Sequence, residues 1–432
     1  MYNRGIFYSR CGDPDMDKPS PAIADHANPF VDWLLSDGLN ITGSKELVGR
    51  LAERLVKAGM PLFRMRVLIR TLHPLTFATH YTWRSDTGKT EVFSPSNEAL
   101  QKPIYLQSPI AAVLEGSGAI RRRLEDKTQE LEFPYFKELQ AEGGTDYVAM
   151  PMVFHDGKIN AVTLASAAPG GFNDEDLKLV SGMLPLLSRM LEVFAVRQTA
   201  KTLIETYIGR HTGKRVLDGL VKRGDGEMIH AVIWFCDLRD SSKLAESLPL
   251  ESFLAVLNDF FDCMAGAILK HGGEVLRFIG DAALAIFPFD EKSKMFEDVC
   301  HSSRSACARA LSAAHEARKS IKELNIDRQG KGLAPLRYGV ALHVGDVMYV
   351  NIGTPQRLEF TVIGRAANEA ARLEELCKNL DHQILISPDF PRCNSKQMVP
   401  LGPHRLRGQT EDWNVYTLAE EMDKACATCY DK

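Results

Sequence analysis

The chain of 432 residues lacks an uninterrupted apolar run of the roughly 18 or more residues that a membrane-spanning helix needs. The nearest candidate, residues 183–196, is interrupted by Pro185, Arg189 and Glu192, a pattern typical of an amphipathic helix. Residues 1–30 are polar and rich in proline, without an apolar segment of the signal-peptide type. We therefore expect no membrane span.

A strong net charge is also missing. The formal charge is −4, so bulk electrostatics give no reason to expect a nucleic-acid partner. The densest basic run, Arg121 to Arg123, is followed at once by Glu125 and Asp126. This mixture of signs predicts the solvated face of a helix rather than a phosphate or membrane contact.

The nine cysteines form no disulfide framework. Their number is odd, and Cys236 and Cys263 lie inside apolar patterns, which indicates reduced thiols and a cytoplasmic location. Cys426 and Cys429 make a lone C-x-x-C pair in a charged tail. With no second pair or histidine nearby, we expect no metal site there.

What is present is an ordinary globular composition, 45% hydrophobic and 25% charged, long enough for two or three domains. Shifts in pattern divide the chain into a disordered segment (1–34), a first domain (35–195), a helical connector (196–227), a second domain (228–420) and a tail (421–432).

The first domain shows an α/β pattern. A helix runs from Ser44 to Gly59, strands follow at 63–69, 77–83, 147–154 and 159–166, and Asn173 caps a helix that begins with three carboxylates. This order resembles a GAF-type sensor domain. The resemblance implies either a small-molecule ligand or a domain that only dimerises.

The connector carries an apolar stripe. Leu187, Met190, Leu191 and Phe194 recur at three- and four-residue spacing within a long helix predicted from Leu184 to about residue 220. A stripe on a connector has no sheet of its own to cover, so we expect a partner helix.

Two aspartates, 44 residues apart, end predicted strands of the second domain. Asp237 closes the apolar run 231–236, and Asp281 follows 276–280. A carboxylate at the end of an apolar strand must be solvated, paired or bound to metal. If the strands are adjacent, the two carboxylates converge, as in sites that hold a pair of divalent cations for phosphoryl chemistry.

Strands and helices alternate through the second domain in an α+β pattern with a ferredoxin-like core. We expect strands ending at 237 and covering 337–344, 347–352, 359–363, 384–386 and 415–418, a hairpin over 274–287, and helices over 250–270, 292–324 and up to residue 377.

Three ordered motifs in this domain resemble the class III nucleotidyl cyclase catalytic domain. They are FCDLRDSS at 235–242, GGEVLRFIGD at 272–281, and FTVIG at 360–364 with NEAAR at 368–372. The resemblance covers about 228–420 and implies an α+β cyclase fold.

The resemblance also implies roles for single residues. Asp237 and Asp281, with the backbone carbonyl of Leu238, would hold two Mg²⁺ or Mn²⁺ ions. Asn368 would orient the ribose, and Arg372 would stabilise charge on the transferring phosphate. These two residues are four apart on a predicted helix and share a face.

Substrate contacts are implied as well. Arg407 falls where the family keeps a basic residue for the terminal phosphates, and Ser242 provides a hydroxyl near the γ-phosphate. By contrast, Asp240 and Ser241 stand where many members have glycine and an aromatic residue. Asp240 would either tune metal affinity or point away from the site.

Base selection depends on two positions. Adenine-specific members have a lysine with an aspartate or threonine there, guanine-specific members a glutamate and a cysteine; this chain has Arg277 and Thr361. Arginine only donates hydrogen bonds, whereas N1 of guanine is itself a donor, so adenine is favoured. Arginine in place of lysine is nevertheless a departure from the family pattern.

The resulting hypothesis is an adenylate cyclase that converts ATP to cyclic AMP at a homodimer interface, because family sites combine the metal aspartates of one subunit with the Asn/Arg pair of the other. Guanylate cyclase and a non-catalytic module for dimerisation or nucleotide sensing are the alternatives; a GGDEF-type diguanylate cyclase fits poorly beyond Gly272-Gly273-Glu274. We expect His343 to be structural and Asp346 to open a hairpin turn.

Overall fold

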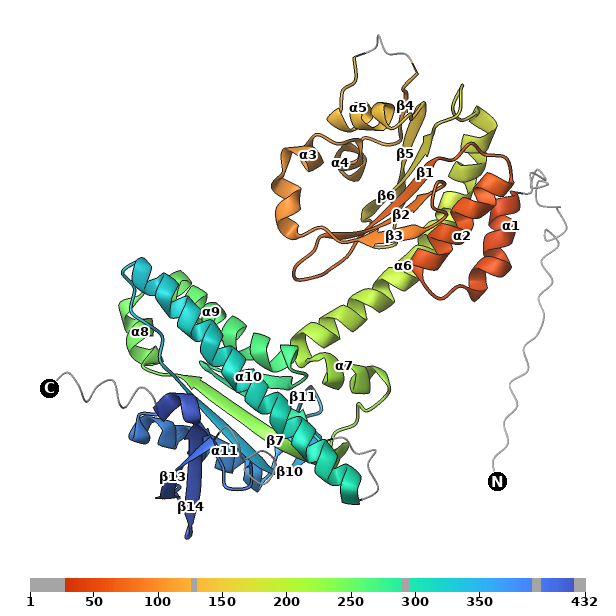
Figure 1. The fold of residues 1–432 in the computed structure, drawn as a ribbon. Helices are drawn as coiled ribbons and strands as arrows, with labels where there is room; N and C mark the ends of the chain where they lie inside the picture. The colour runs from red at the N-terminus through yellow and green to blue at the C-terminus, as the bar shows by residue number, and fades with distance from the viewer. Residues whose placement is uncertain (1–27, 126–129, 290–295, 391–397, 423–432) are drawn as a thin grey trace, which may run out of the picture. The chain divides into compact units, whose positions relative to one another are not determined.

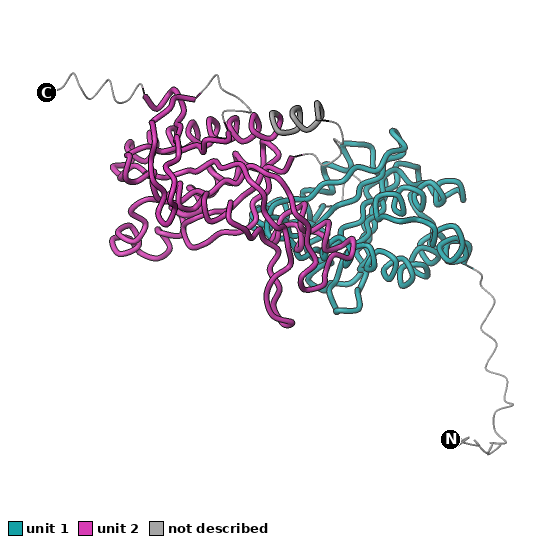
Figure 2. The backbone as a smooth tube through the Cα atoms, turned by 90° about the horizontal axis from the view of Figure 1, so that it is seen from below, with its two compact units in different colours: residues 1–200 teal, residues 201–432 magenta. Residues whose placement is uncertain are grey.

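The computed structural model describes residues 28–125, 130–289, 296–390 and 398–422, with the side chains of 296–304 left aside. The chain separates into two compact units, residues 1–200 and 201–432 (Figures 1 and 2). Most of the predicted disordered segment 1–34 lies outside the described residues. Its last part is helical, however, since α1 spans Pro29–Leu35, so the prediction is wrong there.

The N-terminal unit contains a six-stranded antiparallel sheet with the order β3-β2-β1-β6-β5-β4. Its strands are β1 (Arg64–Arg70), β2 (Ala78–Arg84), β3 (Thr90–Phe93), β4 (Ile120–Arg123), β5 (Asp146–Val153) and β6 (Ile159–Ser166). The four strands expected from the sequence are confirmed to within one residue or so, and β3 and β4 were not foreseen.

Helices cover both faces of this sheet. One face packs on α1, α2 (Ser44–Lys57) and the first half of α6 (Asp174–Ile208), and a 3₁₀ turn at Asp37–Asn40 links α1 to α2. The other packs on α4 (Pro109–Leu114) and α5 (Pro134–Ala141), with α3 (Pro103–Leu106) following a 3₁₀ turn at Asn97–Gln101. Alternation within β1 explains the layers: Val67 enters the first core and Leu68 the second.

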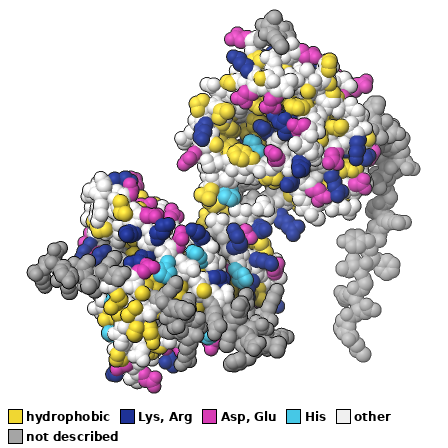
Figure 3. All heavy atoms as spheres, viewed as in Figure 1, with side chains coloured by type: hydrophobic (Ala, Val, Ile, Leu, Met, Phe, Trp, Pro, Cys, Tyr) yellow, Lys and Arg dark blue, Asp and Glu magenta, His cyan; other side chains and the backbone are white. Residues whose placement is uncertain are grey.

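The basic run at 121–123 lies on strand β4, so the predicted helix face is wrong. Arg121 instead ion-pairs with Asp146 (Nη2–Oδ2 3.0 Å) and Asp174 (Nη1–Oδ1 2.7 Å), and Asp146 is fully buried. On the face of this unit seen in Figure 3, basic and acidic side chains are interspersed. Local carboxylates thus neutralise these arginines.

The predicted continuous connector helix is broken. The helix α6 ends at Ile208, Gly209 adopts a left-handed φ of 91°, and α7 covers Arg210–Leu217. No side chain of Gly209 can cap α7, and a buried carboxylate from another element does so. Glu274 Oε1 accepts from the Thr212 amide (2.8 Å) and hydroxyl (2.7 Å) and from Tyr349 Oη (3.0 Å).

The C-terminal unit is built on an eight-stranded sheet with the order β13-β14-β12-β10-β7-β9-β8, and β11 pairs with β10. The strands are β7 (Gly226–Leu238), β8 (Glu274–Ile279), β9 (Ala282–Pro288), β10 (Tyr338–Thr354), β11 (Arg357–Ile363), β12 (Ile384–Ile386), β13 (Met398–Arg405) and β14 (Asp412–Leu418).

Four of these strands stand in the order β10-β7-β9-β8. Together with α9 (Leu250–Lys270) and α10 (Phe296–Gly330), which are labelled in Figure 1, they give the βαββαβ core expected from the sequence. Both helices pack on one face of the sheet, around Trp234 and Phe260. The other face is covered by β11 and α11 (Arg365–Leu380), and α8 (Ser241–Ser247) follows β7.

One long strand replaces two predicted ones. β10 runs through residue 346 without a hairpin, so the turn expected at Asp346 is wrong. Asp346 pairs in register with His230 on β7, and its Oδ1 lies 2.7 Å from His230 Nδ1. A polar residue within an apolar run is a common sign of a turn, which explains the wrong prediction. Here the carboxylate of Asp346 instead has a partner, His230, on the neighbouring strand.

Two helices among the described residues are long and apolar enough to cross a membrane when only length and composition are considered, namely α6 and α9. About a third of each apolar window, 33%, is buried inside the protein. Val256, Phe260 and Met264 of α9 belong to the core of the sheet, and Val180, Leu184 and Leu187 of α6 belong to the N-terminal core.

Glu274→Ala should free α7 from the sheet, because three donors lose their only charged acceptor at a cost of about 2–4 kcal/mol. Amide hydrogen exchange of the full chain should then show faster exchange in peptides over 210–217. The control is Glu316→Ala, which removes an exposed ion pair with Lys270 (2.6 Å) and should leave exchange unchanged. Unaltered exchange in Glu274→Ala would contradict the capping role.

Candidate active site

The register of the central strands brings Asp237 and Asp281 together. On β7, Trp234 and Cys236 face α9 and α10, so the alternating position 237 faces the side of the sheet that α11 covers. Asp237 pairs with Ala282, the residue after Asp281, and the Leu238 amide donates to the Asp281 carbonyl at 3.3 Å. The predicted convergence of the two strand ends is therefore observed.

The two carboxylates repel each other in a half-buried position. Burial raises the pKa of Asp237 to about 6, and the neighbouring Asp281 carboxylate adds to the rise. The Leu238 amide and the charge of Arg239 offset this rise in the pKa only in part, so the pair favours binding of further positive charge.

A third carboxylate, Glu374 on α11, lies close to this pair and was not found from the sequence. Burial raises its pKa to about 7, with Asp237 as the largest charged contributor. Its carboxylate lies over Gly339, which is opposite Asp237 in the sheet, and any side chain at 339 would collide with it. The available signal was a glutamate next to Leu373 on the buried stripe of α11.

The donor set fits divalent cations. Among the described residues, no group of three or more His, Cys, Asp or Glu side chains is arranged to hold a metal ion. Mg²⁺ is commonly held by only one or two carboxylates together with substrate phosphates and water. Asp237, Asp281 and the backbone at Leu238 match that smaller requirement.

The two predicted base-reading positions lie on strands that an ion pair connects. Arg277 on β8 and Thr361 on β11 lie on different strands, and Glu359, two residues before Thr361, ion-pairs with Arg277 (Oε1–Nη1 3.2 Å). Arg277 Nε and the hydroxyl of Thr361 are buried with no hydrogen-bond partner among the described residues. Orphaned polar atoms of this kind are rare in folded proteins and indicate a place for a ligand or water.

A third set of predicted site residues, Asn368 and Arg372, lies on one side of α11. Asn368 and Arg372 are one turn apart, as predicted, and neither makes an ion pair or side-chain hydrogen bond to a described residue. An added Cβ at Gly408 would lie 3.7 Å from Arg372 Nη2, so the loop that carries Arg407 is beside it. Arg407 itself is exposed and lies 3.8 Å from Glu375 Oε1.

In the loop after Asp237, the side chain of Asp240 points toward two basic residues. Asp240 has a left-handed φ of 58°, a conformation that explains why glycine suits this position. Its carboxylate contacts Lys243 Nζ at 2.9 Å and Arg337 Nη1 at 3.8 Å, with no contact to Asp237. Ser242 lies exposed in the first turn of α8.

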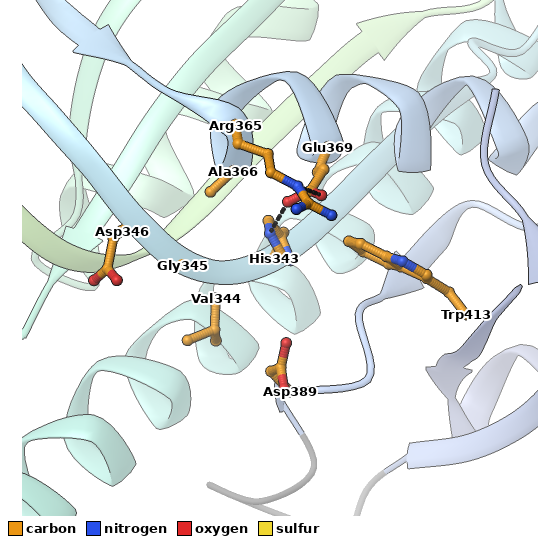
Figure 4. Close-up of a pocket in the computed structure, with 9 residues that line it drawn as sticks. All are labelled: His343, Val344, Gly345, Asp346, Arg365, Ala366, Glu369, Asp389 and Trp413. Atoms are coloured by element: carbon orange, nitrogen blue, oxygen red, sulfur yellow. Dashed lines mark hydrogen bonds and ion pairs between the residues drawn. The ribbon is translucent and has the colours of Figure 1, made fainter. Parts of the chain in front are cut away.

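A separate polar pocket of about 350 Å³ contains none of the predicted site residues (Figure 4). Its floor is His343, whose Nε2 lies 3.3 Å from Glu369 Oε2, while Arg365 Nε and Gln409 Nε2 donate to Glu369 Oε1 at 2.7 and 2.8 Å. His343 and Glu369 are 3% and 6% exposed. The predicted structural role of His343 agrees with this buried pair.

Comparisons with known proteins identify the domain. Residues 227–420 match the family model described as the adenylate and guanylate cyclase catalytic domain. This part of the chain therefore has the class III cyclase catalytic domain, with a mixed α/β fold.

The chain is similar to uncharacterized proteins of Mycobacterium bovis (31% identity over 189 residues, 43% of this chain and 32% of the relative) and Mycobacterium tuberculosis (31% over 200 residues, 46% and 32%). The similarity spans about a third of each relative's length.

One similar solved structure is the adenylyl cyclase CyaB from P. aeruginosa, with 24% identity and a TM-score of 0.39 over 45% of this chain and 95% of that chain. Another is the guanylyl cyclase Cya2, with 26% identity and a TM-score of 0.38 over 45% of this chain and 94% of that chain.

The raised pKa of Glu374 predicts a pH dependence of stability in the presence of a chelator. Between its ordinary value of 4.5 and about 7, the folded state binds more protons at this carboxylate than the unfolded state does. The free energy of unfolding should therefore fall as the pH rises from 5 to 7.5. Denaturant titrations should show a shallower fall in Glu374→Gln and an unchanged one in the control, Glu375→Gln. Equal slopes in Glu374→Gln and the wild type would contradict the assignment.

Proposed function

We propose that the chain is an adenylate cyclase that converts ATP to 3′,5′-cyclic AMP and pyrophosphate. The observation that carries the proposal is the side-by-side placement of Asp237 and Asp281 within the residues that match the cyclase family. In this reaction the ribose 3′-oxygen attacks the α-phosphorus, and the bond from that phosphorus to pyrophosphate breaks.

Asp237 and Asp281, with the Leu238 carbonyl, would hold two Mg²⁺ or Mn²⁺ ions, which when bound acidify the 3′-hydroxyl and neutralise the triphosphate. The protein's own task is then positioning and charge stabilisation.

The group on α11 has the chemistry for the sugar and phosphates. The Asn368 amide would orient the ribose, and the guanidinium of Arg372, which no described carboxylate pairs, would stabilise charge developing on the α-phosphate. Arg407, beside Arg372, would contact the terminal phosphates, and the Ser242 hydroxyl would lie near the γ-phosphate. All four roles use groups that remain exposed or half-exposed in the single chain.

A homodimer would complete the site. One chain carries one copy of each set, and among the described residues no hydrogen bond or ion pair joins Asp237 or Asp281 to Asn368, Arg372 or Arg407. If each site takes the aspartates of one subunit and the α11 group of the other, a two-fold dimer forms two sites.

The N-terminal unit is proposed as a GAF-like regulatory domain with a small-molecule ligand. Support comes from the sheet face that α4 and α5 cover. There the buried Nε2 of His80 has no hydrogen-bond partner among the described residues, and burial, with Arg66 nearby, lowers the pKa of His80 to about 4.

Guanylate cyclase is the second candidate, because the carboxylate of Glu359, when it is not paired with Arg277, can accept from the donors at N1 and N2 of guanine. Adenine remains favoured because Arg277, four residues before Asp281, offers only hydrogen-bond donors.

Purified protein with Mn²⁺ or Mg²⁺ should form cyclic AMP from ATP, with GTP the poorer substrate. Asp237→Ala and Asn368→Ala should each reduce the rate by about 100-fold or more, since each removes a group that acts on the reacting atoms. Lack of product from either nucleotide with both metals would favour the non-catalytic alternative.

Mixing the two inactive variants tests the shared site. Random exchange makes half of the dimers mixed, and each mixed dimer has one intact site, so activity should recover to about a quarter of the wild type. The matched control mixes Asp237→Ala with Asp281→Ala, whose defects fall on the same half and should not complement. No recovery despite demonstrated subunit exchange would contradict the model.

A further inference from the structure

The Arg277–Glu359 ion pair joins two strands that are not neighbours in the sheet. Arg277 is on β8, which pairs with β9, whereas Glu359 is on β11, which pairs with β10. The two atoms Nη1 and Oε1 are 3.2 Å apart, and the side chains are 37% and 45% exposed. Exposed pairs of this kind contribute only about 0–1 kcal/mol to stability, so stability alone does not account for this link between separate strands.

Strand geometry places the pair at the base position. Residues two apart on a strand share a face, so Glu359 and Thr361 both project from β11 on the same side. Arg277 reaches Glu359 from β8. The cluster therefore offers fixed donors on Arg277, a carboxylate acceptor on Glu359 and the unpartnered hydroxyl of Thr361, which can donate or accept.

The two purines differ in what they require of such a cluster. Adenine presents an acceptor at N1 and a donor at its exocyclic amine. Guanine presents a donor at N1, a donor at N2 and an acceptor at O6, so a free carboxylate can accept from N1 and N2 together. In the ion pair, the Glu359 carboxylate is neutralised and directed toward Arg277. The guanidinium donors that remain can donate to N1 of adenine, and the Thr361 hydroxyl can accept from its exocyclic amine.

We propose that Glu359 is a specificity-determining residue that acts through Arg277. It positions the guanidinium beside Thr361 to read adenine, and the pairing withholds its own carboxylate from guanine. The proposal rests on the cyclase function proposed above and deepens it by naming what sets the choice between ATP and GTP.

The pair makes a distinctive double-variant prediction. Arg277→Leu removes the cation and leaves Glu359 as a free acceptor, which should shift the ratio of kcat/KM for ATP over GTP toward GTP by about tenfold or more, as one unpaired polar group at a binding site can. Adding Glu359→Gln to Arg277→Leu should abolish this gain for GTP. A gain that persists without the carboxylate would overturn the proposal.

The single variant tests positioning. Glu359→Gln should lower the ATP over GTP ratio about five- to tenfold, mainly through a higher KM for ATP, because the untethered guanidinium loses its fixed geometry. Glu359→Asp keeps the charge and should restore most of the ratio. The control Asp412→Asn makes the same kind of change in the exposed Arg405–Asp412 pair (2.8 Å) of this unit and should leave the ratio unchanged. A ratio that Glu359→Gln does not alter would overturn the proposal.

Binding measurements separate this proposal from the cyclase function itself. Affinities for 3′-deoxy-ATP and 3′-deoxy-GTP, which lack the attacking hydroxyl, should show the same shifts in calorimetry of the full chain. If the variants shift binding but the wild type shows no turnover, the cyclase activity is rejected and the role of Glu359 is retained. If the wild type turns over nucleotide but the variants leave the ATP over GTP ratio unchanged, the role of Glu359 is rejected and the cyclase activity is retained. Absence of both binding and turnover would overturn both proposals.

Discussion

The repulsion between two carboxylates held at one end of the central sheet is the constraint on which the rest of the site depends. The strand register places Asp237 beside Asp281, because Asp237 pairs with Gly339 on β10 and with Ala282, the residue after Asp281, on β9. Glu374 adds a third carboxylate, which occupies the space that a side chain at Gly339 would take. Binding of a cation or a proton at this end of the sheet therefore lowers the electrostatic free energy of the folded protein. The folding free energy already includes the repulsion between these charges.

Ordered motifs made the core of the site predictable. A strand that ends in aspartate can be recognised in a sequence because the apolar run stops at a charged residue. Helix geometry alone predicts that Asn368 and Arg372, which are one turn apart, share a face. Glu359 and Glu374 were missed because their significance arises from partners far along the chain, Arg277 on another strand and Asp237 across the sheet. No local pattern encodes such tertiary neighbours.

The errors in predicted elements have physical causes of the same kind. A strand partner satisfies Asp346 where a turn was expected, buried Asp146 neutralises the arginine at 121, and Gly209 interrupts a helix whose apolar spacing continues past it. In each case a tertiary contact or a single left-handed residue overrides the local pattern. The hydrophobic periodicity itself was read correctly, which is why the core strands β7, β8 and β9 and the helix α9 lie where the sequence placed them.

The two faces of the catalytic sheet serve different needs. On one face, Trp234 of β7 and Phe287 of β9 pack against α9 and α10 in an apolar core, and burial of this apolar surface stabilises the fold. The other carries the half-buried charges, orphaned polar atoms and exposed cations of the site, groups whose contribution to stability is small or unfavourable. Because apolar cores on both faces stabilise the fold, exposed residues such as Arg277 and Glu359 are not needed for stability and remain available to act on the nucleotide.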